Sequence, residues 1–329
     1  MPPGEPGAER PSPSALIESV PNFSDGRRRD VIDAILEAVR RSGPVAILDA
    51  SSDRDHNRSV LTLAGAPAAV RAALLALVGA CVERIDLRGH RGGHPRMGAV
   101  DVIPLVPIRG VGMQDCVALA RDLGALIAAR HDLPVYLYEK AATAPHRRNL
   151  ADIRKGEFEG FAEKMKDPLW KPDFGPARVH PTAGCVAVGA REFLIAYNIN
   201  LASADLGLAK AIARLIRESS GGLPCVKAMG VLLEDRRVAQ VSINLTDFRT
   251  TPLHVVFGRV REEAARHGVE VSGSEIVGLV PADALVETAR HALKLEAFDA
   301  SKVLEHRLDE ALAAGGARDP SASGGGTGR

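Results

Sequence analysis

Two histidines and three arginines lie close together between residues 88 and 99, where the sequence reads RGHRGGHPRMGA. The glycines and the proline of this stretch argue against a helix. Histidine exchanges a proton near neutral pH, and guanidinium groups bind anions through several hydrogen-bond donors. The stretch therefore predicts a loop that transfers a proton beside an anionic ligand.

Three interpretations of His90 and His94 remain open on these residues alone. Their spacing is that of two zinc ligands on one helical face, although glycine disfavours a helix here and the glutamate of a metalloprotease motif is missing. In the second interpretation both are surface histidines without a function. In the third, which we favour, one of them is a general acid and base. The arginines Arg88, Arg91 and Arg96 are either solvated or bind an anion together with the exposed amides of the glycines.

A second stretch, residues 171–184, is dense in proline and glycine and reads KPDFGPARVHPTAG. It is either a stiffened linker between domains or a clamp for a ligand, because clefts between domains are favoured ligand sites. The chain has no GxGxxG after a strand, no GxxxxGK[ST] and no GxSxG. A dinucleotide site, a P-loop nucleotide site and a nucleophile elbow are therefore not expected.

Charge and cysteine content restrict the partners and the compartment. The 42 basic and 41 acidic residues leave a net charge of +1, so no global field directs the protein to nucleic acid or a membrane. The four cysteines are far apart and form no CxxC, which predicts reduced thiols and a cytoplasmic protein. Residues 1–14 and 313–329 are rich in Gly, Pro, Ser or charged residues, and we expect both segments to be disordered.

The hydrophobic pattern predicts two related α/β halves. In the first half, a hairpin with a long loop over residues 49–58 is expected, and Pro104 and Pro107 predict an edge or irregular strand. The expected strands there are 16–21, 45–48, 60–63, 99–106 and 135–138, and the expected helices are 31–39, 70–85 and 115–130. The second half is expected to contain strands 193–201, 226–233, 238–248 and 269–280 and helices 208–218, 252–266 and 282–293.

Both halves thus follow the order βαββαβ, the split βαβ or ferredoxin-like arrangement. The fold class we expect is α/β (α+β), with two related βαββαβ ferredoxin-like sandwich subdomains and a ligand cleft or tunnel between them. The expected subdomains are residues 15–190, which contain the histidine loop, and residues 191–312.

Six motifs along the chain resemble those of the glutamate formimidoyltransferase (formiminotransferase) family. They occur in family order over about residues 16–308 and are VPNFSDG (20–26), DHNR (55–58), HPRMGAVDV (94–102), PVYLY (134–138), DFGP (173–176) and FLIAYNINL (193–201). The resemblance implies a folate-dependent enzyme that transfers a formimino group between N-formimino-L-glutamate and tetrahydrofolate in histidine degradation. It also implies a homodimer with folate between the subdomains, no metal and no nucleotide.

The resemblance also assigns residues. It implies that His94 is the catalytic histidine, whereas His90 matches a family position other than the catalytic one and is left with a supporting or exposed role. From the transfer mechanism we further predict that Arg96 holds a carboxylate of glutamate or of the folate tail and that Asp101 orients the loop. The implied folate-contacting residues are Gly175, Pro176, Ala177, Arg178, Val179, His180, Pro181, Thr182, Ala183 and Gly184.

The chain departs from the family pattern at Gly93, where many members have Glu, and at Leu105, where they have Phe. We expect the loss of a carboxylate beside His94 either to lower the pKa of its imidazole or to change its orientation. Two other function classes remain open: a hydrolase or cyclase acting on a formyl- or formiminofolate, and a non-catalytic folate-binding protein. The resemblance does not extend to a cyclodeaminase domain, so a separate cyclodeaminase would be a partner.

Overall fold

The computed structural model describes residues 15–313. The chain divides into two compact units, residues 1–192 and 193–329, which we call unit 1 and unit 2. Of the two segments expected to be disordered, residues 1–14 and all of 313–329 except Ala313 lie outside the described residues.

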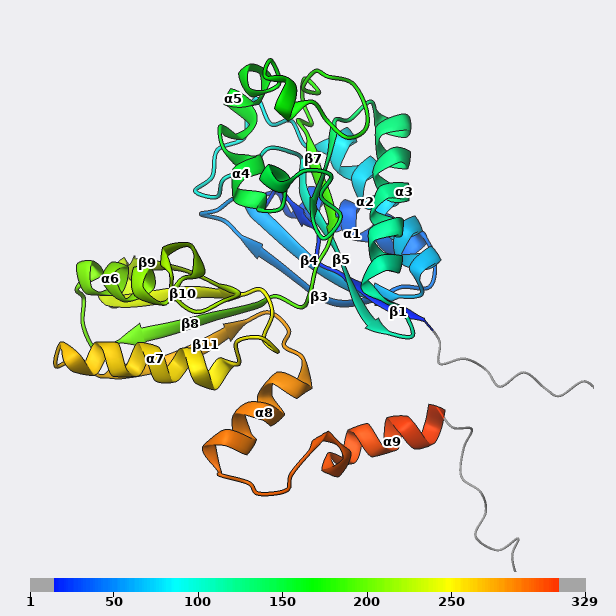
Figure 1. Ribbon diagram of the computed structural model, residues 1–329. Coiled ribbons are helices and arrows are strands. Elements are labelled where there is room, and N and C mark those ends of the chain that lie inside the picture. Colours follow the sequence, from blue (N-terminus) through cyan, green and yellow to red (C-terminus); the bar gives the residue numbers. More distant parts are fainter. Residues whose placement is uncertain (1–14, 314–329) are drawn as a thin grey trace, which may run out of the picture. The chain divides into compact units, whose positions relative to one another are not determined.

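Unit 1 is built on one seven-stranded sheet (Figure 1). Its strands are β1 (Leu16–Ser19), β2 (Asn22–Phe23), β3 (Ala46–Asp53), β4 (Arg58–Gly65), β5 (Val100–Arg109), β6 (Val135–Glu139) and β7 (Val186–Ala190). β1 and β2 are successive pieces of one interrupted strand, because both pair with β4 on one side and β5 on the other. The order across the sheet is thus β3, β4, β1 with β2, β5, β7, β6.

The first four of these positions form the predicted ferredoxin-like sheet, in which the first strand lies between the third and the fourth. β7 and β6 extend it with parallel pairing beyond β5. β7 was not predicted, because it is a short, fully buried run without the alternation that marks a half-buried strand. The β3–β4 hairpin is also tighter than predicted, because its strands end at Asp53 and begin at Arg58.

The prolines predicted that this strand is either an edge strand or an irregular one. The edge alternative is wrong, since β5 lies between β1 with β2 and β7, and the irregular alternative is confirmed, since the pairing of β5 with β1 and with β2 shifts in register. The Pro104 carbonyl accepts a hydrogen bond from Ser19 Oγ at 2.6 Å, so the backbone of this proline faces β1 and β2. Leu105 pairs with Ser19 and Val102 pairs with Asn22, which leaves Pro104 opposite the break between the two strands. The missing N–H of proline therefore costs no ladder hydrogen bond.

Helices cover both faces of this sheet. Three long helices pack on one face with the main core, and two short ones cover the β5–β7–β6 region on the other face with Tyr136, Phe161 and Met97 (Figure 1). The long helices are α1 (Arg29–Arg41), α2 (Pro67–Arg84) and α3 (Met113–His131), and the short ones are α4 (Leu150–Arg154) and α5 (Glu157–Lys164). The buried residues of α1 recur at helical spacing, as its sequence predicts.

Unit 2 has the same ferredoxin-like strand order as unit 1, but among its described residues the sheet has only four strands and no added parallel strands. Its strands are β8 (Ile195–Leu201), β9 (Val226–Leu233), β10 (Val238–Leu245) and β11 (Val271–Val277), in the antiparallel order β11, β8, β10, β9. α6 (Leu206–Ile216) and α7 (Leu253–Arg266) pack on one face, followed along the chain by α8 (Ala282–Ala292) and α9 (Leu304–Ala313). This order is the ferredoxin-like one, so the predicted fold class is confirmed.

The thiols of Cys81, Cys116 and Cys185 are buried and unpaired, and burial raises the pKa of each. Within residues 15–313, no helix combines the length and the hydropathy needed to cross a bilayer.

Candidate functional site

His94 lies in the loop between α2 and β5, residues 85–99, and borders a small polar pocket. Connections of unit 1 supply most of the pocket: the turn after β2, the β3–β4 turn and this loop. The lining residues are Ser24, His56, Asn57, Arg58, His90, His94, Arg96 and Asp101. Both histidines and one of the three arginines of the predicted loop are therefore brought together, along with residues from a second turn.

Asn57 joins the β3–β4 turn to the histidine loop. Its backbone adopts a φ of +50°, which asparagine tolerates better than most residues. Its amide nitrogen donates to the Arg91 carbonyl at 3.0 Å, and its amide oxygen accepts from the Gly26 N–H at 3.0 Å. Gly93 N–H adds a hydrogen bond to the Asp55 carbonyl at 3.0 Å. The loop is thus held in place at Arg91 and Gly93, between His90 and His94.

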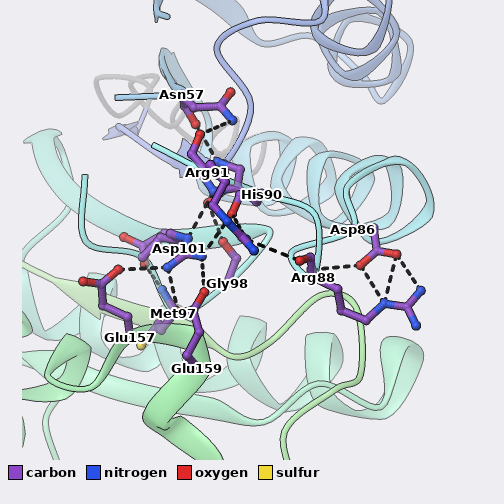
Figure 2. A network of polar contacts seen from close by, with 12 residues as sticks. Asn57, Asp86, Arg88, His90, Arg91, Met97, Gly98, Asp101, Glu157 and Glu159 are labelled. Carbon is purple, nitrogen blue, oxygen red and sulfur yellow. Dashed lines mark hydrogen bonds and ion pairs between the residues drawn. The ribbon is translucent and has the colours of Figure 1, made fainter. Parts of the chain in front are cut away.

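His90 is buried, and both of its ring nitrogens are engaged (Figure 2). Arg96 Nε donates to His90 Nδ1 at 3.1 Å, and because a guanidinium is only a donor, Nδ1 must be the acceptor. His90 Nε2 then carries the proton and donates to the Asn57 carbonyl at 2.9 Å. Burial lowers the pKa of His90, so the neutral tautomer is fixed. The predicted exposed role of His90 is therefore wrong, and neither ring nitrogen has a lone pair left for a metal.

Arg96 is neutralised by the protein itself. Its guanidinium pairs with Glu157 at 2.9 Å and with Glu159 at 2.6 Å, two residues that begin α5 and approach the loop in Figure 2. Together with His90, these partners occupy the guanidinium of a side chain that is nearly buried. The geometry therefore favours a structural role for Arg96 over the predicted role as a carboxylate ligand.

The remaining arginines of the predicted loop, Arg88 and Arg91, are not part of the pocket. Arg88 is exposed and forms an ion pair with Asp86 at 2.6 Å, and the exposed Arg91 donates to the His90 carbonyl at 2.7 Å. Neither residue lines the pocket. Of the open interpretations for these two cations, the structure supports the solvated one.

Asp101 fixes the other end of the loop. Its Oδ1 accepts from the Met97 N–H at 2.9 Å, and its Oδ2 accepts from Arg154 Nε at 2.8 Å. The carboxylate is almost fully buried, at 2% side-chain exposure, and Arg154 closes a second contact to it through its terminal nitrogen. This arrangement can perform the orienting role predicted for Asp101, with Arg154 of α4 as the countercharge.

The electrostatics of the pocket keep His94 uncharged. Burial, with repulsion from the guanidinium groups of Arg58 and Arg154 and from His56, lowers the pKa of His94 to about 3. At neutral pH the imidazole is therefore a free base that can accept a proton. His56 lies edge-on to it, with ring centroids 6.3 Å apart, and its Nδ1 contacts Asp53 Oδ2 at 2.8 Å.

The second predicted stretch, residues 171–184, begins with an anchored motif. Asp173 forms a buried ion pair with Arg147 at 2.7 Å and accepts from the Leu137 N–H at 2.8 Å. Phe174 joins the core of unit 1. Gly175 follows with a φ of +84°, and a Cβ there would lie 2.3 Å from the Leu133 carbonyl oxygen, so only glycine fits.

The end of this stretch is tied to the end of the histidine loop. Ala99 N–H donates to the Ala183 carbonyl at 2.9 Å, and Gly184 forms an isolated antiparallel β-bridge with Gly98. His180 Nδ1 accepts from the Ala183 N–H at 3.0 Å, which closes the turn. None of residues 175–184 lines the His94 pocket, so the two predicted regions are neighbours along residues 97–99 and not one pocket.

Sequence reasoning gave no role in the site to three residues at or beside the pocket: His56, Arg58 and Arg154. The DHNR motif contains the first two, but a turn of polar residues is more often only a turn. Arg154 is far from the loop in sequence, and no local signal connects it to Asp101. Leu105, where the chain departs from the family pattern, lies in the core of unit 1.

Among residues 15–313, no group of three or more His, Cys, Asp or Glu side chains is placed to hold a metal ion. The fold and the pocket thus define a class: a protein of two ferredoxin-like units, the first of which holds a neutral histidine among guanidinium groups.

Comparison with known proteins gives the family. Residues 16–191 match the formiminotransferase domain, N-terminal subdomain, and residues 196–310 match the formiminotransferase domain. A glutamate formimidoyltransferase of Streptococcus pyogenes serotype M1 is 45% identical over 294 residues, which are 89% of this chain and 98% of that protein. One of Thermoplasma acidophilum is 46% identical over 299 residues, 90% of this chain and 98% of that protein.

The formimidoyltransferase-cyclodeaminase of Rattus norvegicus is 44% identical over 282 residues, which are 84% of this chain but 52% of that protein. The chain therefore belongs to the formiminotransferase family, and the resemblance inferred from its motifs is confirmed.

Proposed function

We propose that this protein is a glutamate formimidoyltransferase that moves the formimino group from N-formimino-L-glutamate to tetrahydrofolate, forming 5-formiminotetrahydrofolate and L-glutamate in histidine degradation. The observation that carries the proposal is the position of His94. It lies in the family's HPRMG motif and is an uncharged imidazole, half-exposed at a pocket lined by the Arg58 guanidinium.

The reaction needs one proton to be moved twice. Folate N5 attacks the formimino carbon and must lose its proton, and the glutamate nitrogen must gain one when its bond to that carbon breaks. His94 accepts the first proton and donates it in the second step, so the imidazole ends as it began. In the reverse direction the glutamate ammonium group first loses one proton to solvent, and the neutral amine attacks the formimino carbon. His94 then takes the next proton from this nitrogen and returns one to N5 as the bond to N5 breaks. A general acid and base of this kind contributes about 10²- to 10⁴-fold to the rate.

We further propose that the loop from Gly175 to Gly184 contacts the folate. Support comes from its anchoring: the DFGP motif is held by a buried ion pair, and the end of the loop is hydrogen-bonded to the segment that follows His94. We expect a homodimer in the cytoplasm, with a separate cyclodeaminase acting on the product. We also expect no requirement for a metal or a nucleotide.

The assay that tests the proposal combines purified protein, tetrahydrofolate and N-formimino-L-glutamate and follows glutamate release. Release that requires tetrahydrofolate and continues in the presence of a chelator supports the transferase. In the reverse assay, loss of 5-formiminotetrahydrofolate without added glutamate would identify a hydrolase or cyclase instead. Tight folate binding without turnover in either direction would identify a binding protein.

A further inference from the structure

Arg58 is the unexplained cation of the pocket. It begins β4 and lines the pocket with His94, and its buried Nε has no hydrogen-bond acceptor. Among residues 15–313 it also forms no ion pair, in contrast to Arg96 and Arg154 nearby. A buried donor without an acceptor is costly, so this arrangement calls for an anion that the protein does not supply.

The acidic groups around Arg58 are already committed to other partners. Asp101 uses one oxygen for the Met97 N–H and the other for Arg154. Asp53 accepts from the backbone of its own turn and contacts His56. Arg154 adds a second positive charge close to Arg58. The local charge therefore favours an anionic ligand beside His94.

We propose that Arg58 binds the α-carboxylate of the amino-acid substrate, N-formimino-L-glutamate in one direction and L-glutamate in the other. This assignment rests on the proposed function, because the reaction supplies the anion. Arg58 is a binding residue that touches the substrate and sets its orientation toward His94. A guanidinium suits this task because its donors match the two oxygens of a carboxylate.

The covalent structure of the substrates favours this carboxylate over those of the folate tail. In an α-amino acid, the carboxylate oxygens lie about 3 Å from the amino nitrogen, given ordinary bond lengths. The nitrogen that exchanges its proton with His94 therefore brings the α-carboxylate into the same small pocket. The carboxylates of the folate tail are separated from N5 by the methylene, the second amine and the whole benzoyl ring, and they cannot reach Arg58 while N5 is at His94.

Three variants test the assignment: Arg58→Gln, Arg58→Lys and, as a matched control, Arg88→Gln, which removes an exposed cation of the neighbouring loop. For Arg58→Gln we expect the KM for N-formimino-L-glutamate to rise about 30-fold or more, as when one partner of a buried charge pair is lost. The KM for tetrahydrofolate should not change. Arg58→Lys should recover part of the loss, because lysine keeps the charge without the fork geometry, and Arg88→Gln should behave as wild type.

A substrate analogue makes the test specific. N-formimino-4-aminobutanoate lacks only the α-carboxylate, so wild type should use it at least about 30-fold less efficiently. Arg58→Gln should show no such discrimination, because the two changes remove the same contact and their effects do not add. The melting temperature of each variant and its affinity for tetrahydrofolate establish that it is folded.

Each outcome has a defined meaning. Inactive wild type would count against the proposed function itself. Active wild type with an unchanged amino-acid KM in Arg58→Gln would overturn the Arg58 assignment alone. A rise confined to the KM for tetrahydrofolate, or discrimination against the analogue that persists in Arg58→Gln, would overturn it as well. If Arg58→Gln does not fold, the same comparison is made with Arg58→Lys.

Discussion

The two units share one strand order but differ in what they carry between the strands. In each, the first strand lies between the third and fourth, and long helices pack on one face, three in unit 1 and two in unit 2. In each, the residue before the third strand has a φ of +50°, Asn57 in unit 1 and Arg237 in unit 2. Asn57 is buried and joins two connections, whereas Arg237 is exposed in a short turn.

The connection before the fourth strand differs more. In unit 1 it spans residues 85–99 and contains His90, His94 and Arg96, whereas in unit 2 it is only residues 267–270. Unit 1 also gains β6, β7 and two covering helices, which deliver Arg154 to Asp101 and Glu157 to Arg96. The shared scaffold thus specifies no chemistry by itself, and the chemistry resides in the connections that unit 1 enlarges.

The largest effect should come from His94, in the longer connection of unit 1. We expect His94→Ala to lower kcat about 10²- to 10⁴-fold, because the proton then has no carrier, while the affinity for tetrahydrofolate remains. The control is His267→Ala, an exposed histidine in the equivalent connection of unit 2, which should retain full activity. Wild-type turnover by His94→Ala would remove this histidine from the mechanism.

The buried carboxylates of the two units allow a second test. Asp101→Asn leaves the guanidinium of Arg154, which is only 18% exposed, without its countercharge, and we expect the free energy of unfolding to fall by about 3 to 5 kcal/mol. Glu263 in unit 2 is equally buried, but its partners Arg259 and Arg266 are 40% and 63% exposed. Glu263→Gln should therefore cost about 1 kcal/mol or less, since water stabilises the released cations.

Urea denaturation of both variants measures the difference. Equal losses would show that the Asp101 pair is no more than an ordinary surface contact. If the activity of Asp101→Asn falls by more than its fraction of folded protein does, Asp101 also orients the histidine loop.

The features that sequence reasoning predicted are local, and those it missed depend on distant partners. The helices and the unit 2 hairpin follow from periodicity, and the family from motifs, because both signals lie within short windows. The edge assignment of β5 was wrong because Pro104 lies opposite a break between two other strands, which no local pattern reveals. β7 was missed because a fully buried parallel strand lacks alternation.

The site shows the same division. His94 was identified from its loop and motif, although its catalytic role is still a prediction. Arg96 looked like a ligand-binding cation because Glu157 and Glu159, which occupy it, lie far along the chain. Arg58 looked like part of a turn because the pocket that leaves it unpaired exists only after folding.

Two glycines with nearly the same backbone conformation allow the cost of a left-handed φ to be distinguished from the cost of a steric clash. Gly184 has a φ of +70° and Gly268 one of +69°, but a Cβ at Gly184 would lie 2.1 Å from the Met97 carbonyl oxygen, whereas one at Gly268 meets nothing within 4 Å. Gly268→Ala should cost about 1 kcal/mol of unfolding free energy, the price of the left-handed conformation. Gly184→Ala should cost about 2 to 3 kcal/mol, because the backbone must also shift.

Urea denaturation again compares the pair, and folate affinity adds a functional measurement. Because Gly184 joins the proposed folate loop to the segment after His94, Gly184→Ala should also weaken tetrahydrofolate binding. Equal stability losses in the two variants would mean that the close approach at Met97 is easily relaxed.

The smallest effect is expected at Gly93, one of the two positions where the chain departs from the family pattern. A Cβ at Gly93 would have its nearest neighbours at 3.8 and 4.0 Å, so Gly93→Glu is sterically possible. The new carboxylate, next to His94, would oppose Arg58, Arg154 and His56, which together with burial hold the pKa of His94 at about 3. An opposite charge favours the protonated imidazole, so the pKa of His94 should rise.

A base loses activity as the pH falls through its pKa, so a higher pKa should move the acid limb of kcat/KM to higher pH in Gly93→Glu. In wild type, that limb should lie well below the ordinary histidine range, because kcat/KM reports the free enzyme. The control is Gly89→Glu, which adds the same charge at an exposed position of the same loop with no atom within 4 Å. An equal shift in both variants would indicate a general effect of charge, whereas a shift confined to Gly93→Glu would show that His94 is the group that titrates.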